Sequence, residues 1–454
     1  MRNRTTEGSV WKPLLGFFFP ILLGTFFQQL YNTADAVIVG NFVGKAALAA
    51  VGGPTSIFIN LLVNLFVGLS SGATVIVARH YGAQELDAVR RTVHTSVALA
   101  LAAGLGVTVV GILLSRPILV AMGTPDEVMG YALTYLRIYF LGSVASFLYN
   151  VGSSVLRAVG DNRRPLFFLI AACMTNIVLD LIFVVGFHWD VMGAALATVL
   201  SQVVSAVLVL TSLRHPGSLF CLEWREVRFH RDILLDVVKI GLPTGLQSDM
   251  YNFSNLFIQS CINAFGTDTM AAWTAFGKLD AFYWMVSAAF GVALTTFVGQ
   301  NFGAQKYDRV RQGVRVSLGM IAGTTALISL LFCLFAQPLL RIFNGDPEVL
   351  SIGSLILWHM SPFYITFVFI EIFSAAIRGT GDSIKPMLLT AGGVCVLRVV
   401  WIFTVLPFHN TLETLLLSYP ITWVLTSALF IVYYLRNNWM RRQIRKYGYA
   451  PEVR

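Results

Sequence analysis

Five acidic side chains lie inside long apolar runs of the sequence: Asp35, Asp180, Asp249, Asp280 and Glu371. A charge at the centre of a membrane helix costs about 2.5 to 3.5 kcal/mol on insertion scales, so such residues normally have a partner or a functional task. A carboxylate in an apolar bundle can hold a proton, coordinate a cation or attract a positively charged molecule. These five acids are therefore the first candidates for a functional site.

A polar stripe surrounds the first of these acids. Gln28, Tyr31, Asn32 and Asp35 recur at intervals of three and four residues, which places them on one face of a helix. We expect Gln28, Tyr31 and Asn32 to line a substrate cavity.

A second pair of polar residues has helical spacing. Asn176 and Asp180 are four residues apart and so share a helix face, where an amide oxygen and a carboxylate could coordinate a cation or hold a proton. Two carboxylates in one buried site do not both ionise readily, so a pair of Asp35 and Asp180 could exchange a proton near neutral pH. Such a pair suits coupling to an ion gradient. The alternative is that each Asp only pairs within its own bundle.

Lys278 and Asp280 lie two residues apart, on different faces of one predicted helix, so each needs another partner. A pairing of Lys278 with Glu371 or Asp249 would be purely structural. In the functional alternative, Lys278, Asp280 and Glu371 line the substrate cavity. The two acids would then favour lipophilic cations, and anionic compounds would be poor cargo.

The composition indicates which solvent surrounds these residues. The 454 residues are 56% hydrophobic and only 12% charged, with a mean hydropathy of +0.72. Soluble domains carry about 25% charged residues, so we expect a chain embedded in a lipid bilayer. The net charge of +9 would suggest nucleic acid as a partner of a soluble protein, but here the distribution of charge among loops matters more.

The elements that position the acids are predicted to be transmembrane helices. A hydrocarbon core of about 30 Å needs about 20 apolar residues per helix. The apolar segments lie near 13–39, 48–78, 93–115, 128–156, 166–187, 192–213, 237–263, 269–299, 313–337, 349–377, 386–408 and 412–435. These twelve segments predict an all-α polytopic membrane protein. Its long polar connection predicts an N-terminal lobe (1–215), a linker (216–236) and a C-terminal lobe with a basic tail (237–454).

The basic residues predict the orientation in the membrane. Of the 32 Lys and Arg residues, 26 fall at the two ends and in every second loop. Cytoplasmic loops concentrate basic residues, so we expect both termini to be cytoplasmic in a bacterial inner membrane. The first apolar stretch is too long for a signal peptide and is interpreted as the first transmembrane helix.

The two halves of the sequence repeat at an offset of 221 residues. Ten of 23 positions agree between 74–96 and 295–317, and the segment 156–165 matches 377–386 in the same register. Each half contains an even number of helices, which predicts two parallel six-helix bundles related by a pseudo-two-fold axis along the membrane normal. A transport path between the halves is the natural inference.

Several other kinds of site are not indicated. The sequence contains no Walker A motif, nucleophile elbow or zinc-binding spacing, and its five Cys residues form no CxxC. We therefore expect no enzyme, no cofactor and no ATP hydrolysis. The glycine pairs Gly68/Gly72 and Gly319/Gly323 are expected to be close contacts between helices.

The sequence motifs resemble those of the multidrug and toxic compound extrusion family over nearly the whole chain. The motifs that carry this resemblance are Gln28-Gln-Leu-Tyr-Asn-Thr-Ala-Asp35, Gly82-Ala-Gln84 with Gly303-Ala-Gln305, and Gly160-Asp161 with Gly381-Asp382. The resemblance implies two bundles in a V shape around a central cavity that opens to each side in turn. It also implies a monomer that exports organic cations in exchange for sodium or protons.

The resemblance also implies residue roles. Asp35, Asn176 and Asp180 are similar to the family's ion site in the N-terminal lobe and would be the ligands of sodium if sodium drives transport. Thr198 lies where the family can add a hydroxyl group. Some members place a Glu where this chain has Tyr251, so the coupling role is expected in the N-terminal lobe.

Two other functions are weighed against an antiporter. A flippase for lipid-linked precursors, from the same superfamily, would be expected to have more than twelve helices and a strongly cationic cavity. A channel or a membrane-embedded enzyme would need a filter-like loop or a catalytic constellation, and neither is evident in the sequence. Flux through the reconstituted protein without a gradient would favour a channel.

Overall fold

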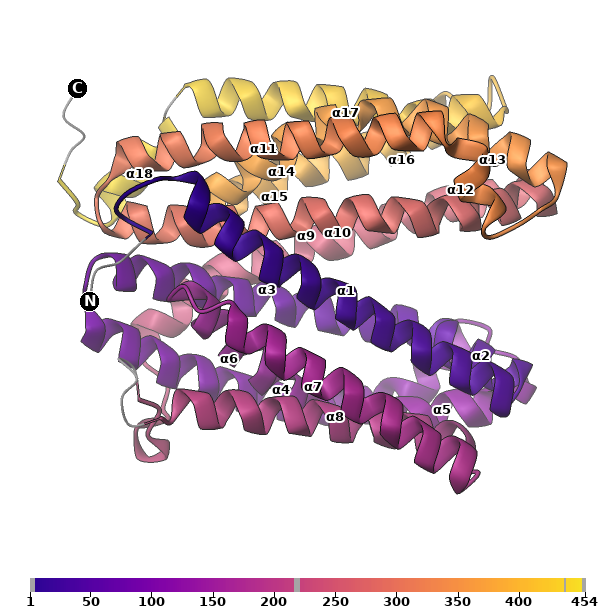
Figure 1. Cartoon of the computed structure of the whole chain (residues 1–454), viewed down its shortest axis with the longest axis horizontal. Helices are drawn as coiled ribbons and strands as arrows, with labels where there is room; N and C mark the ends of the chain where they lie inside the picture. Colours follow the sequence, from indigo (N-terminus) through magenta and orange to yellow (C-terminus); the bar gives the residue numbers. More distant parts are fainter. Residues whose placement is uncertain (1–4, 216–220, 437, 451–454) are drawn as a thin grey trace. The chain divides into compact units, whose positions relative to one another are not determined.

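A computed structural model describes residues 5–215, 221–436 and 438–450 (Figure 1). Every regular element in these ranges is helical, which confirms the predicted all-α class. Residues 1–4, 216–220 and 451–454, which include the first part of the expected linker and the end of the expected basic tail, lie outside the described residues.

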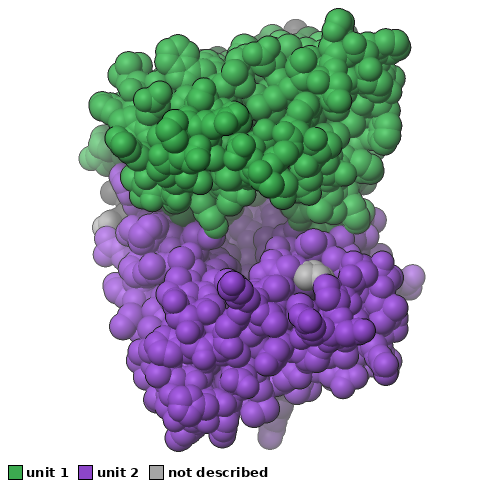
Figure 2. Space-filling model, turned by 90° about the vertical axis from the view of Figure 1, so that its right-hand side faces the viewer, with its two compact units in different colours: residues 1–18, 246–454 green, residues 19–245 purple. Residues whose placement is uncertain are grey.

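Contacts within the chain define two compact units, drawn in green and purple in Figure 2. Unit 1 comprises Met1–Phe18 and Leu246–Arg454, and unit 2 comprises Phe19–Gly245. Both boundaries fall inside long helices, α1 (Trp11–Phe42) and α9 (Arg231–Ala264). The first part of α1 thus belongs to unit 1, and the first part of α9 belongs to unit 2. In the expected division into 1–215 and 237–454, by contrast, each of these helix segments lies in the other half of the chain.

The sequence explains where α1 and α9 change units. Each helix contains one proline near the boundary, Pro20 in α1 and Pro243 in α9. Proline lacks the amide hydrogen that the helix ladder needs, so a helix can change direction there. The first part of α1 is held in unit 1 by the ring of Phe18, which stacks on Phe290 with ring centroids 4.1 Å apart.

Among the described residues, unit 2 is built from α1 and α9 in part and from seven further α-helices and a π-helical segment. These elements are α2 (Lys45–Gly52), α3 (Pro54–Gly82), α4 (Leu86–Ala121), α5 (Asp126–Leu141), α6 (Ser143–Ala158), α7 (Arg163–Asp180), η1 (Leu181–Gly186) and α8 (Asp190–Leu213). Its core contains apolar clusters around Val89, Val155 and Val209, around Val39, Leu136 and Ala194, and around Ile76, Val237 and Ile240, where α3 packs on the first part of α9.

Unit 1 contains the rest of α9 and the helices after it. These are α10 (Thr267–Gly303), α11 (Tyr307–Leu334), α12 (Ala336–Arg341), α13 (Pro347–Met360), η3 (Ser361–Phe363), α14 (Tyr364–Gly379), α15 (Ile384–Thr390), η4 (Ala391–Val396), α16 (Leu397–Thr404), α17 (Leu412–Leu435) and α18 (Asn438–Lys446). The element η4 is π-helical and lies between α15 and α16 in one continuous span.

The helices account for twelve membrane spans. Ten helical stretches of the described residues are long and apolar enough to cross a membrane, and α5 with α6, bent by 49°, makes an eleventh. The twelfth is α9, which is 34 residues long but carries more polar side chains than the others. The chain therefore has the predicted twelve-helix architecture.

The internal repeat is visible in the backbone of equivalent turns. Gln84 and Gln305 have positive φ angles of 63° and 58°, and Gly160 and Gly381 both have a φ of 97°. Each pair is separated by the offset of 221 residues found in the sequence. Positive φ is uncommon for a residue with a side chain. Its recurrence at equivalent Gln residues therefore shows that the two halves of the chain form the same turn.

The first glycine pair makes the close helix contact that its spacing predicts. Gly68 and Gly72 of α3 lie directly against the backbone of α9 at Val237, Gly241 and Gly245, with no room for an added Cβ atom. The expectation for Gly319 and Gly323 was wrong. No described atom lies within 4 Å of a Cβ built at either position, because this face of α11 meets no neighbouring helix there.

The described part of the linker docks on α4. The guanidinium group of Arg90 donates to Glu223 at 2.7 Å and pairs with Glu226 at 3.0 Å. Beside them, the buried hydroxyl of Thr95 accepts from the backbone nitrogen of His230 at 3.3 Å and contacts its ring Nδ1 at 2.8 Å. The linker is therefore tied to unit 2 by both charge and hydrogen bonds.

Candidate functional site

Unit 2 brings together the carboxylates that the sequence analysis paired. Asp35 lies on α1, and Asn176 and Asp180 lie one turn apart on α7. All three are buried, with exposed fractions of 5% for Asp35 and 0% for the two residues of α7. The carboxyl groups of Asp35 and Asp180 lie within hydrogen-bonding reach of each other. The protein therefore encloses two carboxyl groups and an amide in one small volume.

These buried polar atoms lack other partners among the described residues. Apart from the contact between the two carboxyl groups, Oδ1 of Asp35, both carboxyl oxygens of Asp180 and both amide atoms of Asn176 have no hydrogen-bond partner among the described residues. Leaving buried polar groups unsatisfied is costly. A proton shared between the carboxyl groups would satisfy them, and so would a small cation, since all the available acceptors are oxygens.

A ring of hydroxyl and amide groups surrounds this carboxylate site. Thr198, on α8, is buried, and its side chain lies within hydrogen-bonding reach of Tyr31 on α1 and Tyr135 on α5. Tyr139, one turn beyond Tyr135, reaches Gln202 on α8 in the same way. Four helices thus contribute to the site.

Three members of this ring, Tyr135, Tyr139 and Gln202, were not predicted from the sequence. Their spacing was an available signal, because Tyr135 and Tyr139 are four residues apart, as are Thr198 and Gln202. The other members of the first-helix stripe lie differently. Gln28 and Asn32 are exposed on α1, so their place in a substrate cavity stays a prediction.

The local helix geometry next to Asp180 is unusual. Asp180 ends α7, and the chain continues as the π-helical segment η1. Such segments widen the helix and occur often at functional sites. In unit 1, the π-helical segment η4 directly precedes α16, which carries the buried Arg398.

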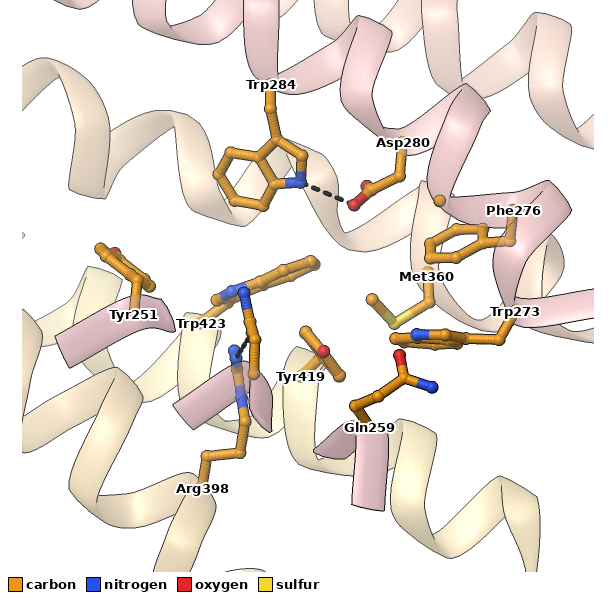
Figure 3. Close-up of a pocket in the computed structure, with 12 residues that line it drawn as sticks. Tyr251, Gln259, Trp273, Phe276, Asp280, Trp284, Met360, Arg398, Tyr419 and Trp423 are labelled. Carbon is orange, nitrogen blue, oxygen red and sulfur yellow. Dashed lines mark hydrogen bonds between the residues drawn. The ribbon is translucent and has the colours of Figure 1, made fainter. Parts of the chain in front are cut away.

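Unit 1 contains a pocket of about 220 Å³ in which Asp280 is the acidic residue (Figure 3). The carboxylate of Asp280 accepts hydrogen bonds from the hydroxyl of Tyr364 at 2.6 Å and from the indole nitrogen of Trp284 at 2.8 Å. The twelve residues that line the pocket are Tyr251, Asn255, Gln259, Trp273, Phe276, Gly277, Asp280, Trp284, Met360, Arg398, Tyr419 and Trp423.

The other acids and the lysine lie away from this pocket. Lys278 is exposed on α10 and is not among the lining residues. Glu371, on α14, places its carboxylate against Gly291 of α10 and within electrostatic range of Arg378. Asp249 is buried in α9. The assignment of Lys278 and Glu371 to a substrate cavity stays a prediction.

Twelve spans in two repeated halves, each half with a buried polar site, define a multi-pass membrane protein of duplicated architecture. The family model described as MatE matches residues 20–182 and again residues 243–404. The chain belongs to the MatE family, which confirms the resemblance seen in its motifs. The double match also agrees with the internal repeat. The family is one of transporters and not of enzymes.

Relatives of known name cover almost the whole chain. The protein is 26% identical to "Probable multidrug resistance protein YoeA" of Bacillus subtilis, over 98% of this chain and 97% of that one. It is 22% identical to the multidrug export protein MepA of Staphylococcus haemolyticus, over 95% of each chain.

Solved structures show the same fold. An outward-facing multidrug resistance MATE family transporter of the MOP superfamily superposes with a TM-score of 0.90 at 23% identity, covering 97% of this chain and 99% of that one. A MATE structure in a bent conformation gives the same TM-score at 24% identity, with the same coverage of both chains.

Proposed function

We propose that the protein is a secondary antiporter that exports organic cations, drugs among them, in exchange for sodium or protons by alternating access. It would act as a monomer in the bacterial inner membrane with both termini in the cytoplasm. The membership of the MatE family and the names of the multidrug relatives support this proposal.

The observation that carries the coupling step is the buried pair of Asp35 and Asp180 with Asn176 beside it. These oxygens would bind a proton or a sodium ion, and Thr198 would supply a hydroxyl at the edge of the site. An ion can drive a conformational change only if its affinity differs between the two states. Here the affinity depends on how closely α1 approaches α7, since the two carboxylates lie on different helices.

The cation would be recognised by polar and acidic side chains outside this pair. We assign this role to Gln28, Tyr31 and Asn32 on α1, and to Lys278, Asp280 and Glu371 in unit 1. The carboxylates would attract cationic cargo, and the hydroxyl and amide groups would orient it.

The test is transport by purified protein in proteoliposomes, with a fluorescent cationic dye and with sodium and pH gradients imposed separately. We expect one gradient to drive accumulation of the dye and the other to have little effect. Dye flux that needs no gradient would contradict an antiporter and favour a channel. Transport of a lipid diphosphate in place of the dye would favour the flippase.

A further inference from the structure

The pocket of unit 1 contains a buried guanidinium group that is poorly satisfied. Arg398 has an exposed fraction of 2% and lines the pocket from α16. One of its terminal nitrogens donates to Oδ1 of Asn255 at 3.4 Å, a long hydrogen bond, and its Nε makes no hydrogen bond within the described residues. Its charged plane lies over the ring of Tyr419 at 3.9 Å from the centroid.

The acid in the same pocket does not neutralise this group by direct contact. Both oxygens of Asp280 are already taken, one by Tyr364 and the other by Trp284. No ion pair between Asp280 and Arg398 is formed at 4 Å or less in the described residues. Figure 3 shows Arg398 at one side of the pocket, apart from the pair of Asp280 and Trp284. The guanidinium group therefore keeps hydrogen-bond donors that Asp280 does not occupy.

The internal repeat explains why a pocket lies here. Thr198 and Gln202, at the carboxylate site of unit 2, correspond at the offset of 221 residues to Tyr419 and Trp423, which line the pocket of unit 1. The same offset relates Tyr139 to Met360. Parts of the two sites are thus built from equivalent positions of equivalent helices.

One acid of the carboxylate site in unit 2 has a neutral counterpart in unit 1. With the first-helix offset of 220 residues, which relates Tyr31 to Tyr251, Asp35 corresponds to Asn255. Unit 2 therefore has a carboxylate where unit 1 has an amide, and that amide contacts Arg398. The site in unit 2 suits a cation, whereas the corresponding place in unit 1 presents a cation of its own.

We propose that the pocket of unit 1 binds aromatic acids, with the carboxylate of the ligand on Arg398 and Asn255. Guanidinium recognises carboxylate by paired, charge-assisted hydrogen bonds, and Arg398 has unused donors for them. The rings of Trp273, Tyr419 and Trp423 form one aromatic wall, with centroid distances of 6.2 Å and 5.5 Å from Tyr419 to the two Trp rings. This wall would hold the flat part of the ligand.

This inference goes beyond the proposed function. It concerns a second chemical class of ligand, and it departs from the expectation that anionic compounds are poor cargo. It does not depend on the coupling ion or on the pair of Asp35 and Asp180. Its test is binding and not transport, so failure of either proposal leaves the other standing.

Three probes that share one fluorophore test the proposal on the purified full chain in detergent. They are dansylglycine, which carries a carboxylate, its methyl ester, which is neutral, and N-(2-aminoethyl)dansylamide, which is cationic. Energy transfer from tryptophan to the dansyl group reports binding, and the variants described next assign it to the pocket. We expect dansylglycine to bind the wild-type protein about ten-fold or more tightly than the ester, as a charge-assisted pair would give.

Two variants test whether the preference for dansylglycine over its ester arises at Arg398. Arg398→Gln removes the guanidinium charge, and Asn255→Asp places a competing carboxylate on it. Each should abolish the preference for dansylglycine over its ester. Arg137→Gln, at an exposed position on α5, is the matched control and should retain it. Asn255→Asp gives Arg398 a better partner, so this variant serves if Arg398→Gln does not yield a monodisperse protein.

Two results would overturn the inference. The first is equal or weaker binding of dansylglycine relative to its ester in the wild-type protein. The second is a preference for the carboxylate that survives in a folded Arg398→Gln or Asn255→Asp variant, because the acid would then be recognised elsewhere. Tight binding of the cationic probe alone would equally contradict it.

Discussion

Asp35 and Asp180 place two buried carboxyl groups within hydrogen-bonding reach of each other. If this pair binds the driving ion, Asp35→Asn should abolish gradient-driven efflux and leave cargo binding to purified protein measurable. Asp180→Asn should do the same, since the ion would lose half of its anionic ligands in either variant. Efflux from proteoliposomes and equilibrium dye binding measure the two quantities separately.

A control variant and a contradicting result complete this prediction. Asp268→Asn removes an exposed carboxylate near the start of α10, away from the pair, and should transport normally. Gradient-dependent efflux at the wild-type rate in both Asp35→Asn and Asp180→Asn would transfer the coupling role to the acids of unit 1.

The sequence alone identified some of the residues that gather in unit 2. Asp35, Asn176 and Asp180 were found because a charge or amide in an apolar run is conspicuous, and helical spacing relates the two residues of α7. Tyr135 and Tyr139 were missed because a tyrosine in a membrane helix is unremarkable. Contacts among several helices determine which face of α5 packs toward α1. The residue pattern of one helix does not predict those contacts.

The pocket of unit 1 was harder to infer than the carboxylate pair. Asp280 was identified as a candidate, but its carboxylate accepts a hydrogen bond from Tyr364, which lies 84 residues away in the chain. Arg398 was visible as a basic residue inside an apolar run, yet its partner Asn255 lies 143 residues earlier. Pairings at such separations follow from the packing of α9, α10 and α16, which periodicity does not specify.

At the scale of elements, the contact between α3 and α9 depends on glycine. An added methyl group at Gly72 would meet backbone atoms of Val237 and Gly241, which cannot rotate away. Gly72→Ala should therefore destabilise the protein by about 1 to 3 kcal/mol, the usual cost of overpacking. Thermal unfolding in detergent, followed by loss of the monodisperse peak, measures this effect.

The second glycine pair supplies the matched control. Gly319→Ala adds the same methyl group where no described atom lies within 4 Å. It should leave stability unchanged or raise it by about 0.5 to 1 kcal/mol, because alanine favours a helix over glycine. An unchanged melting temperature in Gly72→Ala would show that the two helices can separate at no cost.

The docking of the linker on α4 should depend on pH. Partial burial, together with the nearby Arg228 and Arg91, lowers the pKa of His230 below its ordinary value. The docked state therefore prefers neutral His230, and protonation opposes docking. Docking should be complete above the free value of about 6.5 and weaken progressively as the pH falls below it.

Hydrogen exchange of the peptide covering residues 221–230 measures this change. After correction for the intrinsic rate, exchange should be faster near pH 5.5 than near pH 7.5, on either side of the ordinary His pKa of about 6.5. His230→Gln keeps a polar side chain next to Thr95 but does not titrate, so its exchange should lose the pH dependence. Equal protection at both pH values in the wild-type protein would contradict this account.

The helical elements were the most predictable part of the molecule. Apolar runs of about 20 residues identify membrane helices because the bilayer demands them, and basic loops and glycine turns separate them. The pattern did not contain the bend between α5 and α6 or the two π-helical segments. Those features depend on local packing against neighbouring helices, for which the sequence gives no periodic signal.

At the scale of the whole molecule, the charge distribution predicts the orientation. Because most basic residues group with the turns at Gly82, Gly160, Gly303 and Gly381, these turns should be cytoplasmic. In a background without native Cys, Arg163→Cys should react with an impermeant maleimide only in opened cells. Arg341→Cys, exposed at the end of α12, should react in intact cells. The reverse pattern would invert the topology.

The exchange of the first parts of α1 and α9 has a consequence for biosynthesis. The glycine face of α3 is covered by 231–245, which the ribosome makes only after all the other helices of unit 2. The residues up to Phe18 are made first, but they pack with helices that begin after residue 245. Domains usually complete folding in the order in which they are synthesised. Here neither unit can be completed from its own half of the nascent chain. In a translation product that ends after residue 215, Gly68 and Gly72 of α3 would lack the helix that covers them. The first segment of α1 would also lack the helices of unit 1 on which it packs.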